Sequence, residues 1–241
     1  MPFTILIEYM LQAKKYIDDV LHLFFPHVCI GCETDALNAN NALCAECLGK
    51  LPVTGFIDVA NNPVEKIFYG RLPVKHAGSA FYFNKDSIVQ RTIIQLKYKN
   101  NQAAGIFLGR LLGQQIAASN RFEDVDLIIP LPLNDRKLYE RGYNQASVIA
   151  SGIASVWKKP VTENAIDRVL FTDTQTHKDR IARWKTMEGV FTVVQPALIE
   201  NKHILLVDDI VTTGATLEAC GEAVLQIPGV KLSIATIAYT I

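Results

Sequence analysis

The sequence lacks an excess of either charge and lacks a membrane-spanning run. Its 241 residues carry 24 lysines and arginines against 24 aspartates and glutamates, so no overall positive field attracts nucleic acid. The most apolar stretch, residues 1–25, is interrupted by Glu8, Lys14 and Asp18, and nothing else approaches the ~20 apolar residues that a bilayer requires. With no basic leader or cleavage site, this stretch favours an amphipathic helix over a signal peptide. We therefore expect no membrane insertion and a cytoplasmic protein.

Cysteine is also scarce, but four of the five cysteines form two close pairs, Cys29-x-x-Cys32 and Cys44-x-x-Cys47. Such pairs can place four thiolates tetrahedrally around one Zn²⁺, each sulfur ~2.3 Å from the metal. Four thiolates leave no open position, so the zinc would be structural and would supply folding free energy that this short polar segment lacks. A redox dithiol or free thiols are the alternatives. Because residues 29–49 are poor in lysine and arginine, a structural or protein-facing module is favoured over contact with a phosphate backbone.

Strand-like and helix-like segments alternate beyond residue 75, and this alternation predicts an α/β domain with a mostly parallel sheet and helices on both faces. The periodicity predicts strands at 80–83, 125–130, 168–171, 189–194, 203–207 and 232–239, and helices at 87–98, 103–119, 145–157 and 216–226. We expect Cys220, alone in the last helix, to be a small buried hydrophobe. The expected organisation is an N-terminal helix with a small zinc-finger-like module (1–52), a connector (53–74) and the α/β domain (75–241).

The junction between the strand at 203–207 and the helix at 216–226 has the character of a phosphate site. Ligands of open α/β sheets bind beyond the carboxyl ends of the strands, where Asp208 and Asp209 stand. The carboxylates could accept hydrogen bonds from ribose hydroxyls and hold Mg²⁺. The turn that follows offers a permissive glycine, hydroxyls and free helix amides to a phosphate, through Thr212, Thr213, Gly214, Ala215 and Thr216. The alternative is an Asp-Asp turn followed by a threonine helix cap.

Residues 204–216 resemble the 13-residue signature of type I phosphoribosyltransferases: an apolar strand, two acids, two apolar residues and a loop rich in threonine and glycine. Two further segments are similar to the ComF family of competence-associated phosphoribosyltransferase-like proteins, and the four-cysteine module fits that family as well. The segments are Ile129-Pro130-Leu131-Pro132-Leu133 with Arg141-Gly142-Tyr143-Asn144-Gln145-Ala146, and Thr174-Gln175-Thr176 with Arg180, Arg183 and Phe191. The resemblance implies a type I phosphoribosyltransferase fold.

The same resemblance implies a site for phosphoribosyl pyrophosphate (PRPP), or another phosphorylated ribose, together with Mg²⁺. The 5′-phosphate would lie on residues 212–216, the ribose on Asp208 and Asp209, and the pyrophosphate near Arg141 and Asn144. Asp208, Asp209 and Arg141 would then be the catalytic residues. From the residues alone, Arg141 is equally explained by a solvated basic loop that turns at Gly142. Residues 173–183 fit a lid or a surface connector, and Thr186 stands where many family members have asparagine.

Two hypotheses about function follow. The first is an enzyme of nucleotide metabolism that transfers the phosphoribosyl group of PRPP to an unidentified acceptor. The second is a non-catalytic, nucleotide-sensing adaptor, because the family is associated with competence and DNA uptake together with a helicase and recombination proteins. No nucleobase pocket is recognisable, and direct contact with DNA is left open. Thr212 stands where some purine phosphoribosyltransferases have an aspartate that acts as a base. Lys97, at the end of a helix, is explained by the helix dipole alone.

Overall fold

The computed structural model describes residues 16, 28–35, 37, 42–168 and 190–240. The chain divides into two compact units, Met1–Lys50 and Leu51–Ile241, which are described separately. The helix expected over residues 1–25 lies outside the described residues, apart from Tyr16. Within the described ranges, no helix combines the length and apolar character needed to cross a membrane.

The smaller unit is built around its cysteines. Its helix α2 (Ala45–Gly49) begins at Cys44, whose sulfur accepts a hydrogen bond from the Cys47 N–H at 3.5 Å. The loop ahead of it is closed by two backbone bonds, from Glu33 N–H to Cys29 O (2.8 Å) and from Cys29 N–H to Thr34 O (2.9 Å). The described residues of this unit bury only a few small or aliphatic side chains, so packing alone provides little stability.

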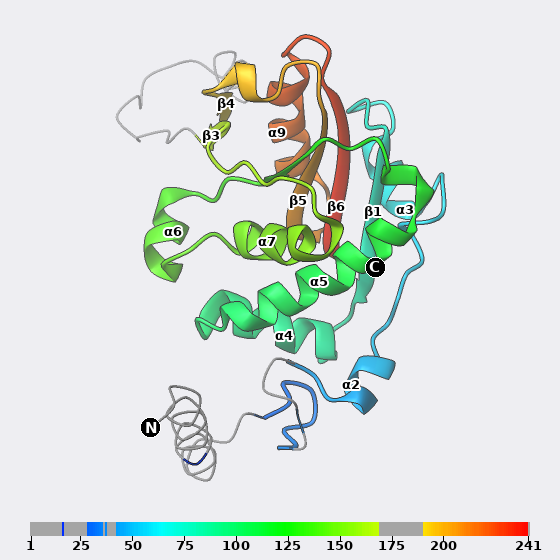
Figure 1. The fold of residues 1–241 in the computed structure, drawn as a ribbon, viewed down its shortest axis with the longest axis vertical. Helices are drawn as coiled ribbons and strands as arrows, with labels where there is room; N and C mark the ends of the chain where they lie inside the picture. Colours follow the sequence, from blue (N-terminus) through cyan, green and yellow to red (C-terminus); the bar gives the residue numbers. More distant parts are fainter. Residues whose placement is uncertain (1–15, 17–27, 36, 38–41, 169–189, 241) are drawn as a thin grey trace, which may run out of the picture. The chain divides into compact units, whose positions relative to one another are not determined.

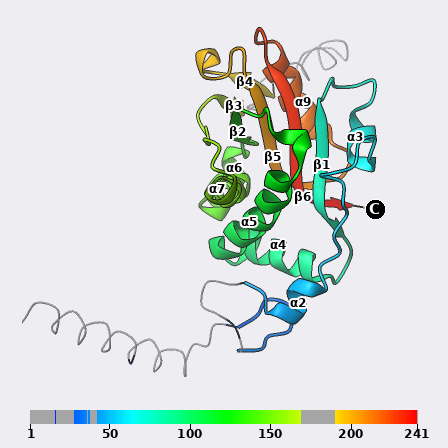
Figure 2. The ribbon, with the colours of Figure 1, turned by 45° about the vertical axis from the view of Figure 1, so that its right-hand side comes forward.

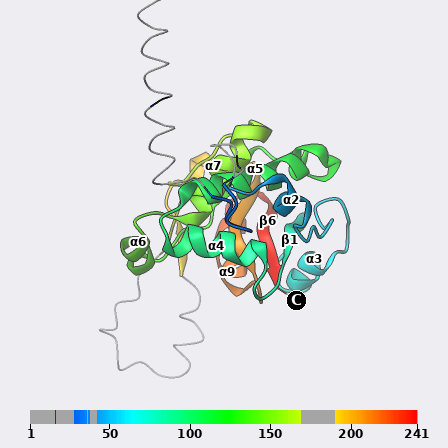
Figure 3. The ribbon, with the colours of Figure 1, turned by 90° about the horizontal axis from the view of Figure 1, so that it is seen from below.

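The larger unit contains the predicted parallel sheet, which is confirmed (Figure 1). Its four strands lie in the order β1 (His76–Phe83), β6 (Lys231–Thr240), β5 (His203–Val211) and β2 (Leu127–Pro130), and every pair is parallel. One face is covered by α4 (Ile88–Tyr98), α5 (Gln102–Ala118) and α7 (Gln145–Trp157), and the other by α3 (Pro63–Phe68) and α9 (Ala215–Leu225) (Figures 2 and 3). Helices on both faces are the condition that all-parallel strands require.

A second, antiparallel sheet pairs β3 (Ile166–Arg168) with β4 (Phe191–Val193). Of the strand predicted at 168–171, only Arg168 is among the described residues, and it ends β3; the strand predicted at 189–194 corresponds to β4, and both short strands lie outside the main sheet. Two single-turn helices, η1 (Asn120–Phe122) and η2 (Pro196–Leu198), complete the connections.

In the described part of the larger unit, two α-helices occur where the sequence predicts none. Residues 53–74, expected to be a connector, contain α3 and bury Val64 and Phe68 completely, so this segment belongs to the core of the larger unit. The expected basic loop contains α6 (Asp135–Arg141). Both helices are short and begin at asparagine caps, which a search for long apolar periodicity does not detect.

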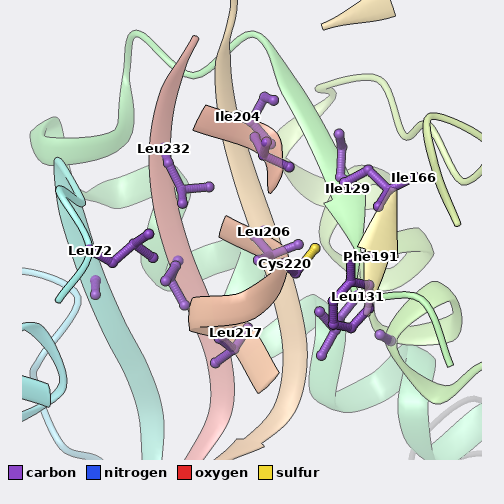
Figure 4. Close-up of a cluster of buried hydrophobic side chains, with 14 of the residues drawn as sticks. Leu72, Ile129, Leu131, Ile166, Phe191, Ile204, Leu206, Leu217, Cys220 and Leu232 are labelled. Carbon is purple, nitrogen blue, oxygen red and sulfur yellow. The ribbon is translucent and has the colours of Figure 1, made fainter. Parts of the chain in front are cut away.

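The core on the α9 side of the sheet is formed by alternate residues of the strands. Ile204 and Leu206 of β5 point toward α9, where they meet Leu217 and Cys220 (Figure 4). Cys220 is fully buried, which confirms the prediction, and this burial raises the pKa of its thiol. The thiol therefore behaves as an apolar group rather than as a nucleophile.

On the opposite face, α5 and α7 cross at glycines. A Cβ at Gly109 of α5 would lie 2.2 Å from the carbonyl oxygen of Ile149, and a Cβ at Gly152 of α7 would lie 2.4 Å from that of Ile106. Backbone atoms occupy the space on both sides, so neither position accepts a side chain without separating the helices.

Replacing Gly109 by alanine should therefore destabilise the protein despite the better helix propensity of alanine. We expect Gly109→Ala to lower the free energy of unfolding by about 2 kcal/mol or more, measured by urea denaturation. Ser151→Ala, an exposed position on α7, is the control and should be neutral or slightly stabilising. Equal stability of the Gly109 variant and wild type would show that the two helices do not depend on this close approach.

Candidate functional site

The acid pair lies within β5 rather than beyond its end. The sequence predicts that the strand stops at residue 207, but pairing with β6 continues from Asp208 opposite Thr236 to Val211 opposite Tyr239. Within the pair, the Asp209 N–H donates to the Asp208 carboxylate at 2.8 Å. The two carboxylates are thus held by a central strand with neighbours on both sides, which gives them little freedom to move.

A cavity of about 140 Å³ opens at this end of the sheet. Five of the predicted site residues line it, namely Asp208, Asp209, Arg141, Asn144 and Thr216. Three further cations line it: Lys137 on α6, which belongs to the same basic segment as Arg141, and two that were not predicted, Lys97 at the end of α4 and Arg168 at the end of β3. The remaining lining residues are Leu131, Pro132, Leu133, Gln145 and Ala146. The cavity therefore brings two carboxylates together with four cations from three separate elements.

The carboxylates are in an unfavourable electrostatic environment. Burial, and secondly the negative charge of Asp209, raise the pKa of Asp208 to about 7. Part of the Asp208 surface faces the cavity, but protein atoms surround the carboxylate enough for desolvation to dominate. Asp209 has a cationic partner, since the Lys97 Nζ lies 2.8 Å from its Oδ2. A positive charge from a ligand or metal would relieve the remaining repulsion.

The predicted phosphate loop leads into α9. Its N-cap is Gly214, whose φ of 75° favours glycine and where a Cβ would lie 2.6 Å from Ile67 Cγ2. No side chain caps this helix end, although the Ala215 N–H reaches the Thr213 hydroxyl at 3.5 Å. The side chains at 212, 213, 215 and 216 are exposed. Thr212, Thr213, Gly214 and Ala215 do not line the cavity; they form the adjoining surface, where the helix amides are accessible to an anion.

Arg141 and Asn144 form the other wall. The Arg141 guanidinium donates to Gln145 Oε1 at 2.6 Å and lies 5.5 Å from the centre of the Tyr98 ring. Asn144 caps α7 by accepting from the Ala146 N–H at 3.0 Å, and it donates to the Leu131 carbonyl at 2.9 Å. The amide of Asn144 is therefore engaged in holding α7 to the end of β2, which gives it a structural role.

A larger groove of about 720 Å³ adjoins the cavity. It runs between α6, α7 and β3, and it shares Pro132, Leu133, Asn144 and Arg168 with the smaller cavity. Its polar lining includes Asp135, Ser147, Ser151, Glu163 and Asp167. The two spaces are therefore neighbours, separated by shared lining residues.

Several predicted residues fall outside the described residues, namely residues 173–183, which include Arg180 and Arg183, and Thr186. Phe191 of the same sequence segment is described; it is buried in β4, and its ring centre lies 5.3 Å from the Arg168 guanidinium carbon.

The four cysteines of the smaller unit converge. The sulfurs of Cys29, Cys32, Cys44 and Cys47 all lie within 4.8 Å of one another, as ligands of one metal ion would. Gly31 makes this possible, because a Cβ there would lie 2.5 Å from the Cys47 sulfur.

The environment of these thiols also suits metal binding. Burial alone raises the pKa of the Cys29 thiol, but N–H groups of Cys44, Cys32 and Gly31 donate to its sulfur and bring the pKa down to about 6. Burial and the neighbouring sulfurs raise the pKa of Cys47 to about 12. When four thiols lie this close, each thiolate makes it harder to deprotonate its neighbours, because the negative charges repel. A bound metal cation would remove this repulsion.

Comparison with known proteins agrees with this geometry. The phosphoribosyl transferase domain family matches residues 144–240. Competence protein F from Haemophilus influenzae is 26% identical over 209 residues, which cover 80% of this chain and 89% of that protein. The DNA utilization protein YhgH from Salmonella typhi is 29% identical over 135 residues, or 55% of this chain and 59% of that protein. The chain thus spans about three fifths of the length of that relative.

Among solved structures, glutamine PRPP amidotransferase from B. subtilis, complexed with ADP and GMP, is similar at a TM-score of 0.42 and 14% identity. The likeness covers 59% of this chain and 30% of that chain.

The sheet, the acid pair at its carboxyl end and the family match define the larger unit as a phosphoribosyl transferase domain of the type I fold. Competence protein F is similar over most of the chain, and the DNA utilization protein over about half of it. The resemblance to the ComF family, with its four-cysteine module, is thereby confirmed.

The cavity also contains residues that sequence reasoning missed. Lys97 was explained by the helix dipole, and Arg168 was predicted only as the first residue of the strand at 168–171. Arg71 supports the loop from outside the cavity, because its guanidinium donates to the Thr213 carbonyl at 3.0 Å and to Glu218 at 2.9 Å. In the sequence, Lys97 and Arg168 are marked only as cations at or near an end of a predicted helix or strand. Surface residues show the same pattern equally often, so the pattern does not identify a site residue.

The raised pKa of Asp208 predicts a dependence of stability on pH. An aspartate whose pKa is higher in the folded than in the unfolded chain costs stability as the pH rises above its unfolded value of about 4. Asp208→Asn removes this cost, so the variant should gain on the order of 2 kcal/mol relative to wild type between pH 5 and pH 8. Thermal unfolding at both pH values measures the gain. Asp167→Asn, an exposed carboxylate on β3, should show no such trend, and a pH-independent effect of Asp208→Asn would contradict the burial argument.

Proposed function

We propose that the larger unit binds PRPP, or a closely similar phosphorylated ribose, together with Mg²⁺. One observation carries the proposal: a desolvated carboxylate pair, an uncapped helix N-terminus and a cluster of cations meet at the carboxyl end of a parallel sheet. Each part complements a different part of PRPP. The ribose carries vicinal hydroxyls, and the 5′-phosphate and the pyrophosphate carry negative charge at opposite ends of the sugar.

The residues would share the ligand as follows. The amides at the start of α9, with the hydroxyls of Thr212, Thr213 and Thr216, would donate to the 5′-phosphate. Asp208 and Asp209 would accept hydrogen bonds from the ribose hydroxyls. Arg141, with Lys137 and Arg168 on the same cavity, would face the pyrophosphate, for which paired guanidinium donors are well suited.

The carboxylate pair also fits Mg²⁺. The carboxylates offer oxygen donors, which Mg²⁺ prefers, and a bound cation would offset the burial and the Asp209 charge that raise the pKa of Asp208. When bound, the metal would neutralise charge on the departing pyrophosphate. Asp208 and Asp209 would orient it, and Arg141 would stabilise the same negative charge from the opposite wall.

If the protein is a phosphoribosyltransferase, an acceptor nitrogen would attack the anomeric carbon of the ribose while pyrophosphate departs. The adjoining groove would hold the acceptor, since it shares Asn144 and Arg168 with the cavity. Thr212 has no basic group, so proton removal from the acceptor does not depend on that position.

The second candidate is an adaptor in which the same site senses a nucleotide. It is favoured by the names of the relatives, a competence protein and a DNA utilization protein. In this case the chain would act in DNA uptake or recombination through partner proteins such as a helicase, with or without direct contact to DNA. Catalysis would then be dispensable, whereas ligand binding would not.

Binding of PRPP is tested by calorimetric titration in the presence of Mg²⁺. We expect Asp208→Asn combined with Asp209→Asn to lower the affinity by at least about 100-fold, since two charge-assisted hydrogen bonds are lost. Asp58→Asn combined with Asp86→Asn removes two exposed carboxylates away from the cavity and should bind normally. Undiminished affinity in the Asp208 and Asp209 variant would place the ligand elsewhere.

Turnover separates the two candidates. Incubation with PRPP and a panel of nucleobases and amines, followed by a pyrophosphate assay, supports the enzyme if any acceptor releases pyrophosphate. Tight binding without release from any acceptor supports the adaptor.

We further propose that the cysteine cluster of the smaller unit binds a structural Zn²⁺. Its four sulfurs converge without an open position, and the unit has little other stabilisation. Such a site requires reduced thiols, which supports a cytoplasmic location. The organisation predicted from sequence, with an N-terminal helix and this module over residues 1–52, remains part of the proposal.

Metal analysis of the purified protein tests the zinc site. We expect about one zinc per chain in wild type and in Cys220→Ala, which alters the buried cysteine of the larger unit. Cys47→Ser should lose most of the zinc and unfold the smaller unit, because the buried sulfur has no replacement. Full zinc content in Cys47→Ser would exclude a four-cysteine site.

A further inference from the structure

Lys97 forms an ion pair with one member of the acid pair. Its Nζ lies 2.8 Å from Asp209 Oδ2, and the side chains of Lys97 and Asp209 are 20% and 10% exposed. Among the described residues, no other lysine or arginine lies within 4.0 Å of either carboxylate. Lys137, Arg141 and Arg168 line the same cavity without such a contact. Lys97 therefore occupies the position on Asp209 that a bound cation would need.

The backbone of Lys97 is fixed against the rest of the site. The Tyr143 hydroxyl donates to the carbonyl of Leu96, and the Arg141 guanidinium stacks on the ring of Tyr98 at 5.5 Å. The two neighbours of Lys97 are thus joined to the segment that carries Arg141. The lysine side chain itself is a flexible four-carbon stem, so its ammonium can move by several ångströms while its Cα stays in place.

An ammonium at 2.8 Å and a divalent cation would compete for the Asp209 carboxylate. Like charges this close repel strongly in a partly desolvated cavity, so a metal ion arriving alone must displace Lys97 and leave its ammonium near the metal. A metal ion arriving with a pyrophosphate group also brings acceptor oxygens of negative charge. The displaced ammonium then gains a new partner within the same cavity.

We propose that Lys97 is a further binding residue of this site. Before a ligand enters, its ammonium pairs with Asp209 in the place of a metal cation. When metal and ligand enter together, the ammonium moves from Asp209 to a pyrophosphate oxygen. This inference rests on the proposed PRPP site and adds a binding order to it. A divalent cation alone binds weakly, a cation with pyrophosphate binds cooperatively, and Lys97 is the origin of that coupling.

The test uses Mn²⁺ and inorganic pyrophosphate as probes on the full chain. Free Mn²⁺ is followed by electron paramagnetic resonance, first alone and then with pyrophosphate. In Lys97→Gln we expect Mn²⁺ alone to bind about 5- to 50-fold more tightly than in wild type, and pyrophosphate in the presence of Mn²⁺ to bind about 5- to 50-fold more weakly. Lys97→Arg keeps the charge and should restore weak binding of Mn²⁺ alone.

The control is Lys99→Gln, which removes an exposed cation two residues away at the C-cap of the same helix and should match wild type. A merely structural ion pair predicts a different pattern, in which Lys97→Gln loses thermal stability and both affinities remain unchanged or fall together. That pattern, or equal effects of Lys97→Gln and Lys99→Gln, overturns the proposal. Because Mn²⁺ alone is one of the readouts, failure of PRPP to bind would leave the Lys97 result interpretable by itself.

Discussion

Two adjacent carboxylates on a central, desolvated strand are the constraint on which the larger unit depends. β5 pairs with β2 on one side and with β6 on the other, so Asp208 and Asp209 are carried to the carboxyl end of the sheet with little freedom to move. Negative charge at this place is costly, as the pKa of about 7 for Asp208 shows. The surrounding cations offset part of this electrostatic cost, and the metal-bound ligand that we propose would offset it as well.

The positive groups reach the cavity from separate parts of the chain. Lys97 ends α4, Arg141 ends α6 and Arg168 ends β3, while the amides belong to the first turn of α9. Their convergence also depends on packing away from the cavity. α5 and α7 approach closely where they cross at Gly109 and Gly152, and this close approach fixes the position of α7. The site is therefore a product of the whole helical layer rather than of the signature segment alone.

The sequence was most informative where local and tertiary preferences agree. The helix predicted at 145–157 has those bounds in the structure, because its apolar face and its asparagine cap both favour them. The prediction was wrong at the end of β5, since two acids disfavour a strand locally but pairing with β6 extends it to Val211. It also missed α3 and α6, two short helices that begin at asparagine caps; in α3 the buried side chains of Val64 and Phe68 add tertiary packing.

By itself, the sequence determined the α/β class, the cysteine module and the place of the acid pair, because periodicity, spacing and strand-end chemistry are local properties of the chain. Only the tertiary structure decided that Lys97 pairs with Asp209, that the Asn144 amide donates to the Leu131 carbonyl, and that a large groove adjoins the cavity. These are contacts between residues far apart in the chain. Their distances depend on how the helices cross and how the strands pair, and no local pattern encodes them.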